Sequence, residues 1–190
     1  MNRRPAAFID RDGVLNADLG YVGRIEDFHW LPGAVAAMGR LQQAGHALVV
    51  VTNQSGIARG LYTLEDFERL TSHMRAELLG HGITLDGVYA CPHLPDASVA
   101  AYRSDCNCRK PRPGMILQAI ADLGLAPEHS NVFGDKASDI AAGRAAGIGH
   151  CWLIGEAAAL AGADADGVFA SLNLAVDSLL AAAIQRSATR

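Results

Sequence analysis

The chain has 190 residues, half of them hydrophobic, and a formal net charge of −4 at pH 7. This length can bury a core, and without repeats or low-complexity blocks we expect residues 1–190 to form one domain. The acidic balance and the lack of a basic run leave no electrostatic footprint for nucleic acid or an anionic membrane. No apolar leader or membrane-length segment is present, so we expect a cytoplasmic protein.

Short apolar runs alternate with helical patterns along the chain. The run "ALVVV" is the clearest buried strand because it is β-branched and uninterrupted. The predicted strands are Ala6–Ile9, Ala47–Val51, Gly87–Ala90, Asn131–Phe133 and His150–Ile154. The predicted helices are Ala34–Ala44, Leu64–Gly80, Gly114–Leu123 and Ser138–Ala146, followed by an alanine-rich helical tail over Ala157–Ala183.

This order predicts an α/β fold with a Rossmann-like, doubly wound parallel sheet covered on both faces. Ligands of such sheets bind beyond the carboxyl ends of the strands. No gap between the predicted elements exceeds what its own helix or loop needs, so we expect no large cap domain. Thr63, with Asp66 three residues later, indicates where the second helix begins.

Chemically active side chains follow several of these strands. The first strand leads into "DRDGV", with Asp10 and Asp12 one residue apart, and the second into "TNQSGIARG", which begins at Thr52. The fourth leads into "GDKASD" at Gly134–Asp139, and "CRKPRPGM" precedes a helix. Two carboxylates this close repel unless a cation relieves them or one keeps a proton. Acids beside lysines suit a divalent cation and a phosphate.

These four motifs, in this order, resemble those of the haloacid dehalogenase (HAD) superfamily over roughly residues 6–150. The resemblance implies that Asp10 is a nucleophile that forms an aspartyl phosphate and that Asp12 is the general acid and base. It also implies Mg²⁺ bound by the Asp10 side chain, the Asp12 backbone carbonyl and Asp135. Mg²⁺ keeps several waters, so few protein ligands suffice.

Further roles follow from the same resemblance. Thr52 and Lys110 are expected to hold the phosphoryl oxygens. Asp139 is expected to orient its neighbours, and Lys136 to pair with an acid. Ion-pumping ATPases of the superfamily carry threonine two residues after the nucleophile, so Asp12 favours a phosphatase. A receiver-like phosphoaspartate switch is the non-enzymatic alternative, but it lacks an acid at that position.

A cysteine cluster is the second feature of the sequence. Cys91, His93, Cys106 and Cys108 offer three thiolates and an imidazole, a donor set that suits structural Zn²⁺. The one-residue gaps are tighter than zinc-finger spacing, and reduced cysteines without metal are the alternative from the residues alone. The arrangement resembles the zinc loop of a HAD subgroup containing heptose-bisphosphate and histidinol-phosphate phosphatases. Cys151 is expected to be a buried strand residue.

The smaller features of the motifs bear on the substrate. "TNQSGIARG" and "CRKPRPGM" look like the heptose-bisphosphate members, which implies removal of the C7 phosphate of a heptose 1,7-bisphosphate; histidinol phosphate is the alternative. Arg109 is the expected ligand of the second phosphate because a guanidinium can bind it bidentately. Other candidates at the substrate are Arg59 and Arg112 for phosphate, and Asn53, Gln54 and Ser55, which contact sugar hydroxyls or else hold their own turn. We expect a monomer.

Overall fold

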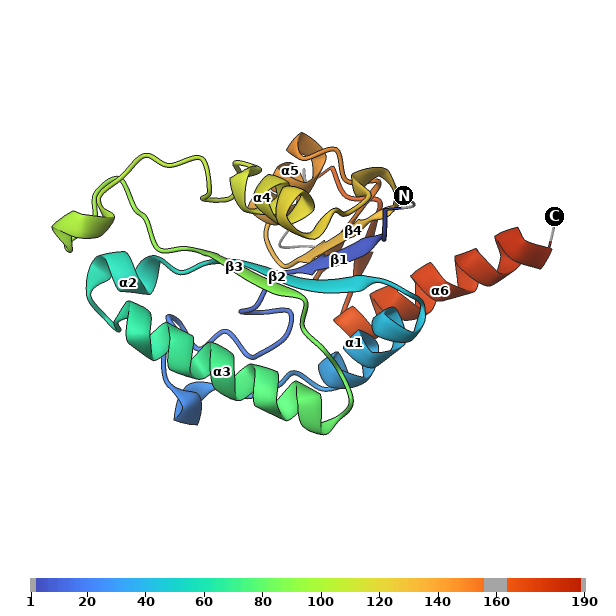
Figure 1. Ribbon diagram of the computed structural model, residues 1–190, viewed down its shortest axis with the longest axis horizontal. Helices are drawn as coiled ribbons and strands as arrows, with labels where there is room; N and C mark the ends of the chain where they lie inside the picture. Colours follow the sequence, from blue (N-terminus) through green and yellow to red (C-terminus); the bar gives the residue numbers. More distant parts are fainter. Residues whose placement is uncertain (1–2, 156–163, 189–190) are drawn as a thin grey trace.

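The computed structural model describes residues 3–155 and 164–188. Six strands form one parallel sheet in the order β3-β2-β1-β4-β5-β6 (Figure 1). The strands are β1 Ala6–Ile9, β2 Ala47–Asn53, β3 Gly87–Cys91, β4 Asn131–Gly134, β5 His150–Ile154 and β6 Gly167–Phe169. The helices are α1 Ala34–Gln43, α2 Ser55–Arg59, α3 Leu64–Gly80, α4 Gly114–Leu123, α5 Ala137–Ala145 and α6 Leu172–Ala188. The predicted fold class is confirmed.

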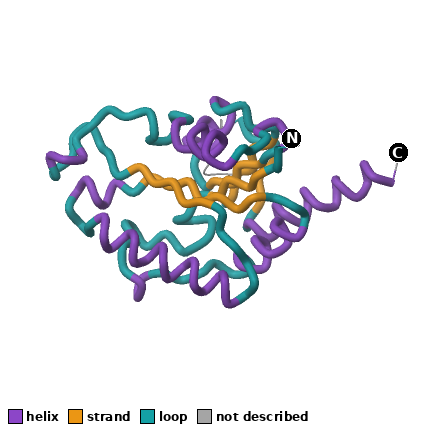
Figure 2. Tube along the Cα trace, in the orientation of Figure 1, coloured by secondary structure: helices purple, strands orange, loops and turns teal. Residues whose placement is uncertain are grey.

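The sheet is buried on both faces because its strands are apolar throughout. Alternate residues of a strand point to opposite sides. Ile9 and Val50 pack with α1, α3 and α6, whereas Phe8 and Val49 pack with α4 and α5. Figures 1 and 2 show the two helical layers on either side of the sheet. Such double coverage is the reason that the strands show continuous rather than alternating hydrophobicity.

The predicted bounds of β1, β3, β4, β5, α1, α3, α4 and α5 agree with the structure to within one residue, whereas β2 and α2 differ more. β2 runs two residues beyond its predicted end because Thr52 and Asn53 pair with Ala90 and Cys91 of β3. The short helix α2 was not predicted. Thr63 caps α3 and forms the reciprocal pair of hydrogen bonds with Asp66 that its spacing indicates.

The prediction of a helical tail over Ala157–Ala183 is wrong in part. Gly167–Phe169 forms β6, and the helix begins only at Leu172. The reason is tertiary: β6 pairs in parallel with the open edge of β5, and that partner cannot be read from an alanine-rich composition. Residues 157–163 of this prediction lie outside the described part of the chain.

The topology sets the place of the site. The chain builds β1, β2 and β3 outward to one side and then returns across β1 to add β4, so the direction of winding reverses between β1 and β4. Ligands bind at such a switch point, beyond the carboxyl ends of the strands. No helix within residues 3–155 or 164–188 combines the length and apolar character needed to cross a membrane. The β3–α4 connection projects as a loop, and the described residues, 3–155 and 164–188, contain no large cap domain (Figure 1).

Candidate active site

Asp10 and Lys110 form a buried ion pair at the end of β1. The lysine Nζ lies 2.8 Å from Asp10 Oδ1, 2.8 Å from the Val51 carbonyl oxygen and 2.6 Å from Asp139 Oδ1. Burial raises the pKa of Asp10, although Lys110 opposes the change. Burial also acts against the charge of Lys110, but Asp10 and Asp139 outweigh it and raise the pKa of the lysine. The lysine is therefore charged and fixed between two carboxylates.

Asp135 follows β4 and faces the same point. Its Oδ2 lies 3.4 Å from Lys136 Nζ, while its Oδ1 is buried with no hydrogen-bond partner among the described residues. Burial, and then the charge of Asp10, raise the pKa of Asp135 to about 7. A buried carboxylate oxygen without a donor is costly, so this atom is suited to receive a cation.

Three carboxylates lie close enough to share an ion. Oxygens of Asp10, Asp135 and Asp139 all lie within 4.8 Å of one another. Asp139 is already committed, because Oδ1 accepts from Lys110 and Oδ2 accepts from the backbone N–H of Lys136 at 2.9 Å. Asp10 and Asp135 are therefore the side chains that fit a hard cation such as Mg²⁺, with Asp139 positioning the lysine.

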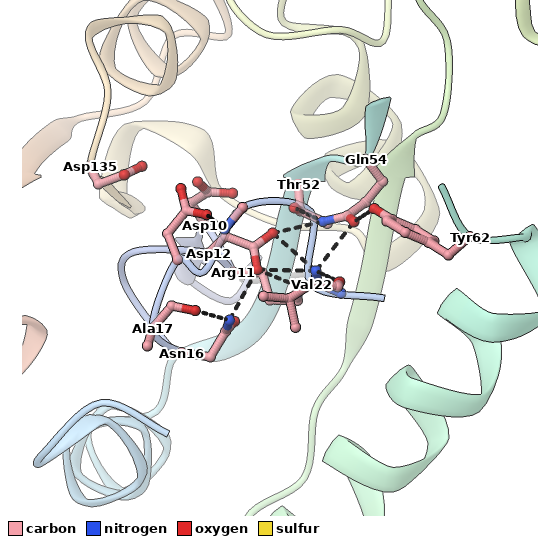
Figure 3. Close-up of polar contacts among 12 residues, drawn as sticks. Asp10, Arg11, Asp12, Asn16, Ala17, Val22, Thr52, Gln54, Tyr62 and Asp135 are labelled. Atoms are coloured by element: carbon pink, nitrogen blue, oxygen red, sulfur yellow. Dashed lines mark hydrogen bonds and ion pairs between the residues drawn. The ribbon is translucent and has the colours of Figure 1, made fainter. Parts of the chain in front are cut away.

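The Asp12 carboxylate forms an ion pair with Arg11, not with Lys110. Arg11 reaches both of its carboxylate oxygens, with Nη2 3.0 Å from each (Figure 3). Asn16 Nδ2 donates to Oδ1 and Gln54 Nε2 to Oδ2, each at 3.0 Å. The two neighbouring carboxylates thus avoid mutual repulsion because each has a cation of its own, Lys110 for Asp10 and Arg11 for Asp12.

Arg11 was not among the predicted site residues, although it stands between the two aspartates of the motif "DRD". A cation between two acids ordinarily lies in solvent, but Arg11 is only 1% exposed. Its guanidinium lies 5.7 Å from the centre of the Phe67 ring and donates to the Val22 carbonyl oxygen. These partners come from distant segments, so spacing alone does not reveal them.

A cavity of about 470 Å³ opens onto this site. Among the residues that line it are Asp12, Tyr21, Gln54, Ser55, Arg109 and Lys110. Arg109 also lines an adjoining cavity of about 290 Å³ and donates to the His93 carbonyl oxygen at 3.4 Å. The cavity is polar and ends at the buried ion pair, which suits a small phosphorylated molecule.

The other predicted substrate residues lie in different settings. The Asn53 amide is engaged with the backbone of Lys110, donating to its carbonyl and accepting from its N–H at 3.1 Å each. The Arg59 guanidinium lies over the Tyr21 ring at 5.8 Å, and Arg112 pairs with Asp105. Of the three candidate arginines, Arg109 is the one that lines the larger cavity. Lys136 lies 3.5 Å from Asp18 as well as beside Asp135.

The cysteine cluster converges beside this rim. Cys108 Sγ lies 3.1 Å from the sulfurs of both Cys91 and Cys106, and His93 Nδ1 lies 3.4 Å from Cys108 Sγ. These S–S separations exceed a covalent disulfide bond, so the four groups form a cluster of free ligands. Three sulfurs and one imidazole nitrogen within 4.8 Å fit a closed tetrahedral zinc site.

The three thiols of the cluster differ in the direction in which their pKa values are shifted. Burial raises the pKa of Cys91 and Cys108. For Cys106 burial acts in the same direction, but hydrogen bonds from Cys108 and Cys91 outweigh it and lower the pKa to about 7. Thiolate is the metal-binding form of cysteine, so Cys106 is the thiol of the cluster that loses its proton most readily near neutral pH. Cys151 is buried in β5, as predicted.

The fold and the site together define a class: a doubly wound hydrolase whose buried carboxylates and lysine meet at the switch point. A family model described as HAD-hydrolase-like matches residues 107–171. A D-glycero-beta-D-manno-heptose-1,7-bisphosphate 7-phosphatase from Photorhabdus laumondii is 49% identical over 150 residues, covering 79% of this chain and 80% of that protein. The Escherichia coli K12 protein of the same name is also 49% identical, covering 79% and 78%.

Solved structures agree. The D,D-heptose 1,7-bisphosphate phosphatase from B. bronchiseptica, complexed with magnesium and phosphate, superposes with a TM-score of 0.82 at 31% identity, covering 93% of this chain and 98% of that one. The chain belongs to the HAD-like hydrolase family, and it is a phosphatase that hydrolyses phosphate monoesters.

Proposed function

We propose that this phosphatase removes the C7 phosphate of D-glycero-β-D-manno-heptose 1,7-bisphosphate. The observation that carries the substrate assignment is the 49% identity, over most of both chains, to enzymes of that name. The site supports it, because the cavity joins a buried carboxylate–lysine pair to Arg109, a second cation suited to another anionic group.

In the first chemical step an Asp10 carboxylate oxygen attacks phosphorus, and the ester P–O bond to the sugar breaks. Asp12 gives its proton to the departing sugar oxygen, which leaves as an alcohol. Lys110 and the Thr52 hydroxyl hold phosphoryl oxygens while charge develops on them. The product of this step is an aspartyl phosphate on Asp10.

In the second step Asp12, now a carboxylate, takes a proton from water. The water oxygen attacks phosphorus, the bond to Asp10 breaks, and inorganic phosphate leaves. Asp12 ends with the proton that the next cycle requires. The hydrogen bonds that both Asp12 oxygens accept from Arg11, Asn16 and Gln54 support the carboxylate form that this second step requires.

Asp10 and Asp135, with the Asp12 backbone carbonyl, would hold Mg²⁺. The support is the orphaned Asp135 oxygen, the oxygen-only donor set, and the magnesium and phosphate of the B. bronchiseptica protein. When bound, the ion supplies positive charge that neutralises the carboxylates and the transferring phosphoryl group. Asp139 keeps Lys110 in place beside it.

The zinc cluster has a separate task in this proposal. Cys91, His93, Cys106 and Cys108 would hold Zn²⁺ and shape the loop that carries Arg109 into the cavity. A loop fixed before binding loses little entropy when the substrate arrives. All these residues come from one chain, so we propose that a monomer suffices.

The test is a comparison of kcat/KM for both heptose-bisphosphate anomers, heptose 7-phosphate and histidinol phosphate. The proposal expects the β-anomer of the bisphosphate to be the best substrate and C7 phosphate to be the one released. A higher kcat/KM for histidinol phosphate would overturn the substrate assignment while leaving the phosphatase chemistry intact.

A further inference from the structure

The amide of Gln54 lies at the centre of a buried polar network (Figure 3). Nε2 donates to Thr52 Oγ1 at 2.7 Å and to Asp12 Oδ2 at 3.0 Å. Oε1 accepts from Arg11 Nη2 at 3.2 Å and from the Tyr62 hydroxyl. Both protons and both lone pairs of the amide are thus used, and the side chain is 2% exposed. It is occupied by the protein, not by a ligand.

The partners of Gln54 fix which way round its amide lies. Arg11 only donates, so it must face the amide oxygen, and this leaves the amide nitrogen to donate to Asp12 Oδ2. A reversed amide would set two donors together at Arg11 and two acceptors together at Asp12. Such mispairing is costly in a buried site, and the observed orientation is therefore the stable one.

Tyr62 adds the fourth contact and is itself tightly held. Burial raises the pKa of its phenol to about 12, which keeps the hydroxyl protonated as a donor. Its ring lies against Gly23 and Gly56, where a Cβ atom would come within 2.3 Å and 2.2 Å of ring carbons. Any larger residue at these glycines would displace the ring, so the backbone is shaped to hold this tyrosine.

We propose that Gln54 is a positioning residue that orients two side chains of the reaction at once, the Thr52 hydroxyl and the Asp12 carboxyl. The proposal rests on the roles given above to Thr52 and Asp12. By donating to Thr52 Oγ1, the amide occupies the acceptor side of that hydroxyl and directs its single proton elsewhere, to a phosphoryl oxygen.

The same amide holds Asp12 Oδ2 on the side opposite Asn16, which contacts Oδ1. Tyr62 acts one step further out, because it helps to set the polarity of the amide and does not touch the phosphate in this scheme. Arg11 sets the same polarity and also contacts Asp12 directly. One buried side chain thereby couples the phosphate ligand on β2 to the acid–base residue after β1.

Two substitutions test the proposal with the full-length, metal-loaded enzyme. Gln54→Glu keeps the oxygen toward Arg11 and Tyr62 but replaces both donors by an acceptor. We expect kcat to fall about 100-fold or more, the range for loss of a positioned donor. Tyr62→Phe removes one hydroxyl and keeps the ring, and we expect kcat to fall about five- to tenfold with KM within about twofold of wild type.

Matched controls separate positioning from stability. Tyr89→Phe removes a hydroxyl that contacts Asp122, and Gln43→Glu places the same new charge on an exposed part of α1. Both should leave kcat within about twofold of wild type. If Tyr62→Phe and Gln54→Glu behave like these controls, or lose activity only in proportion to unfolded protein, the proposal is overturned.

A double variant gives the sharper readout. Thr52→Val should raise the inhibition constant of inorganic phosphate about tenfold in the wild-type background, but less than about threefold when Gln54→Glu is already present, because the introduced carboxylate captures the threonine proton. Equal factors in both backgrounds would overturn the coupling. If Thr52→Val and Asp12→Asn each leave turnover unchanged, the proposed mechanism fails, and this inference fails with it. If those two variants lose turnover but the Gln54 and Tyr62 variants keep wild-type turnover, only this inference is refuted.

Discussion

The two candidate metal centres are built in opposite ways. The carboxylates Asp10 and Asp135 sit at the ends of β1 and β4, adjacent strands whose backbones are bonded in the centre of the sheet. The cysteine cluster takes one ligand, Cys91, from the last residue of β3, whereas His93, Cys106 and Cys108 lie on the loop between β3 and α4. The sheet would hold the first centre with or without a cation, whereas we expect the loop of the second centre to depend on a bound ion for its shape.

The largest expected effect lies at the sheet-held centre. Asp10→Asn removes the proposed nucleophilic carboxylate and keeps the size of the side chain, so we expect turnover to fall about 10⁴-fold or more. Circular dichroism and zinc content should be unchanged, since neither depends on this charge. Asp96→Asn, at an exposed loop position, is the control and should retain activity. Wild-type turnover in Asp10→Asn would remove this residue from the mechanism.

The loop centre should respond to loss of a ligand in a different way. Elemental analysis is expected to give about one zinc per chain for the wild type and almost none for Cys106→Ser. Hydrogen exchange of the 92–109 backbone should accelerate about 100-fold in that variant, while β1, β2 and β4 keep their protection. Cys151→Ala, outside the cluster, should keep its zinc. Uniform loss of protection across the sheet would contradict the contrast between the two centres.

Arg109 tests how the loop serves the chemistry. Arg109→Ala should lower kcat/KM for the heptose bisphosphate by about 2–3 kcal/mol, the range of a hydrogen bond to a charged group. The loss for a monophosphate should be much smaller, because in the proposed mechanism Thr52 and Lys110 hold the reacting phosphate. Arg69→Ala is the matched control, since that arginine is exposed on α3 and pairs with Glu65 and Asp66. Equal losses on both substrates would place Arg109 at the reacting phosphate.

The smallest effect concerns the pH dependence of the metal-free protein. Because the pKa of Asp135 is raised to about 7 when folded, against about 3.9 when unfolded, its contribution to stability is present below pH 4 and lost as pH rises through 7. In EDTA at pH 8, Asp135→Asn should therefore be more stable than wild type by about 2 kcal/mol, and the difference should vanish at pH 4. Thermal unfolding of both proteins across this pH range measures the difference in stability. A difference that stays the same from pH 4 to pH 8 would contradict the raised pKa of Asp135.

The sequence predicts the sheet well because its strands are short, apolar runs buried on both faces. β1 and β5 have their predicted bounds. β6 could not be predicted, since Gly167–Phe169 is a strand only because the edge of β5 accepts it. The same physical limit hides α2, a single short helix with no periodic pattern.

The candidate site shows the same division. Asp10 and Asp135 could be placed because strand ends converge by topology, and Lys110 because its motif before a helix resembles that of the family. The three residues do lie together. Arg11 and Tyr62 could not, since their burial depends on segments that only the folded chain brings near. Gln54 looked available for sugar hydroxyls, but the structure uses every polar atom of its amide internally.

The paired hydrogen bonds between the Asn53 amide and the Lys110 backbone have a consequence for engineering. They fasten Lys110 to β2 independently of the cysteine cluster, as does the lysine side chain at the Val51 carbonyl. Residues 94–105 can therefore be exchanged without releasing Lys110, provided that the new sequence keeps the packing of Leu94 and Ala97 on Ala58. Replacing this segment should change the substrate preference of the enzyme. Asp10 and Lys110 should keep their positions at the edge of the sheet.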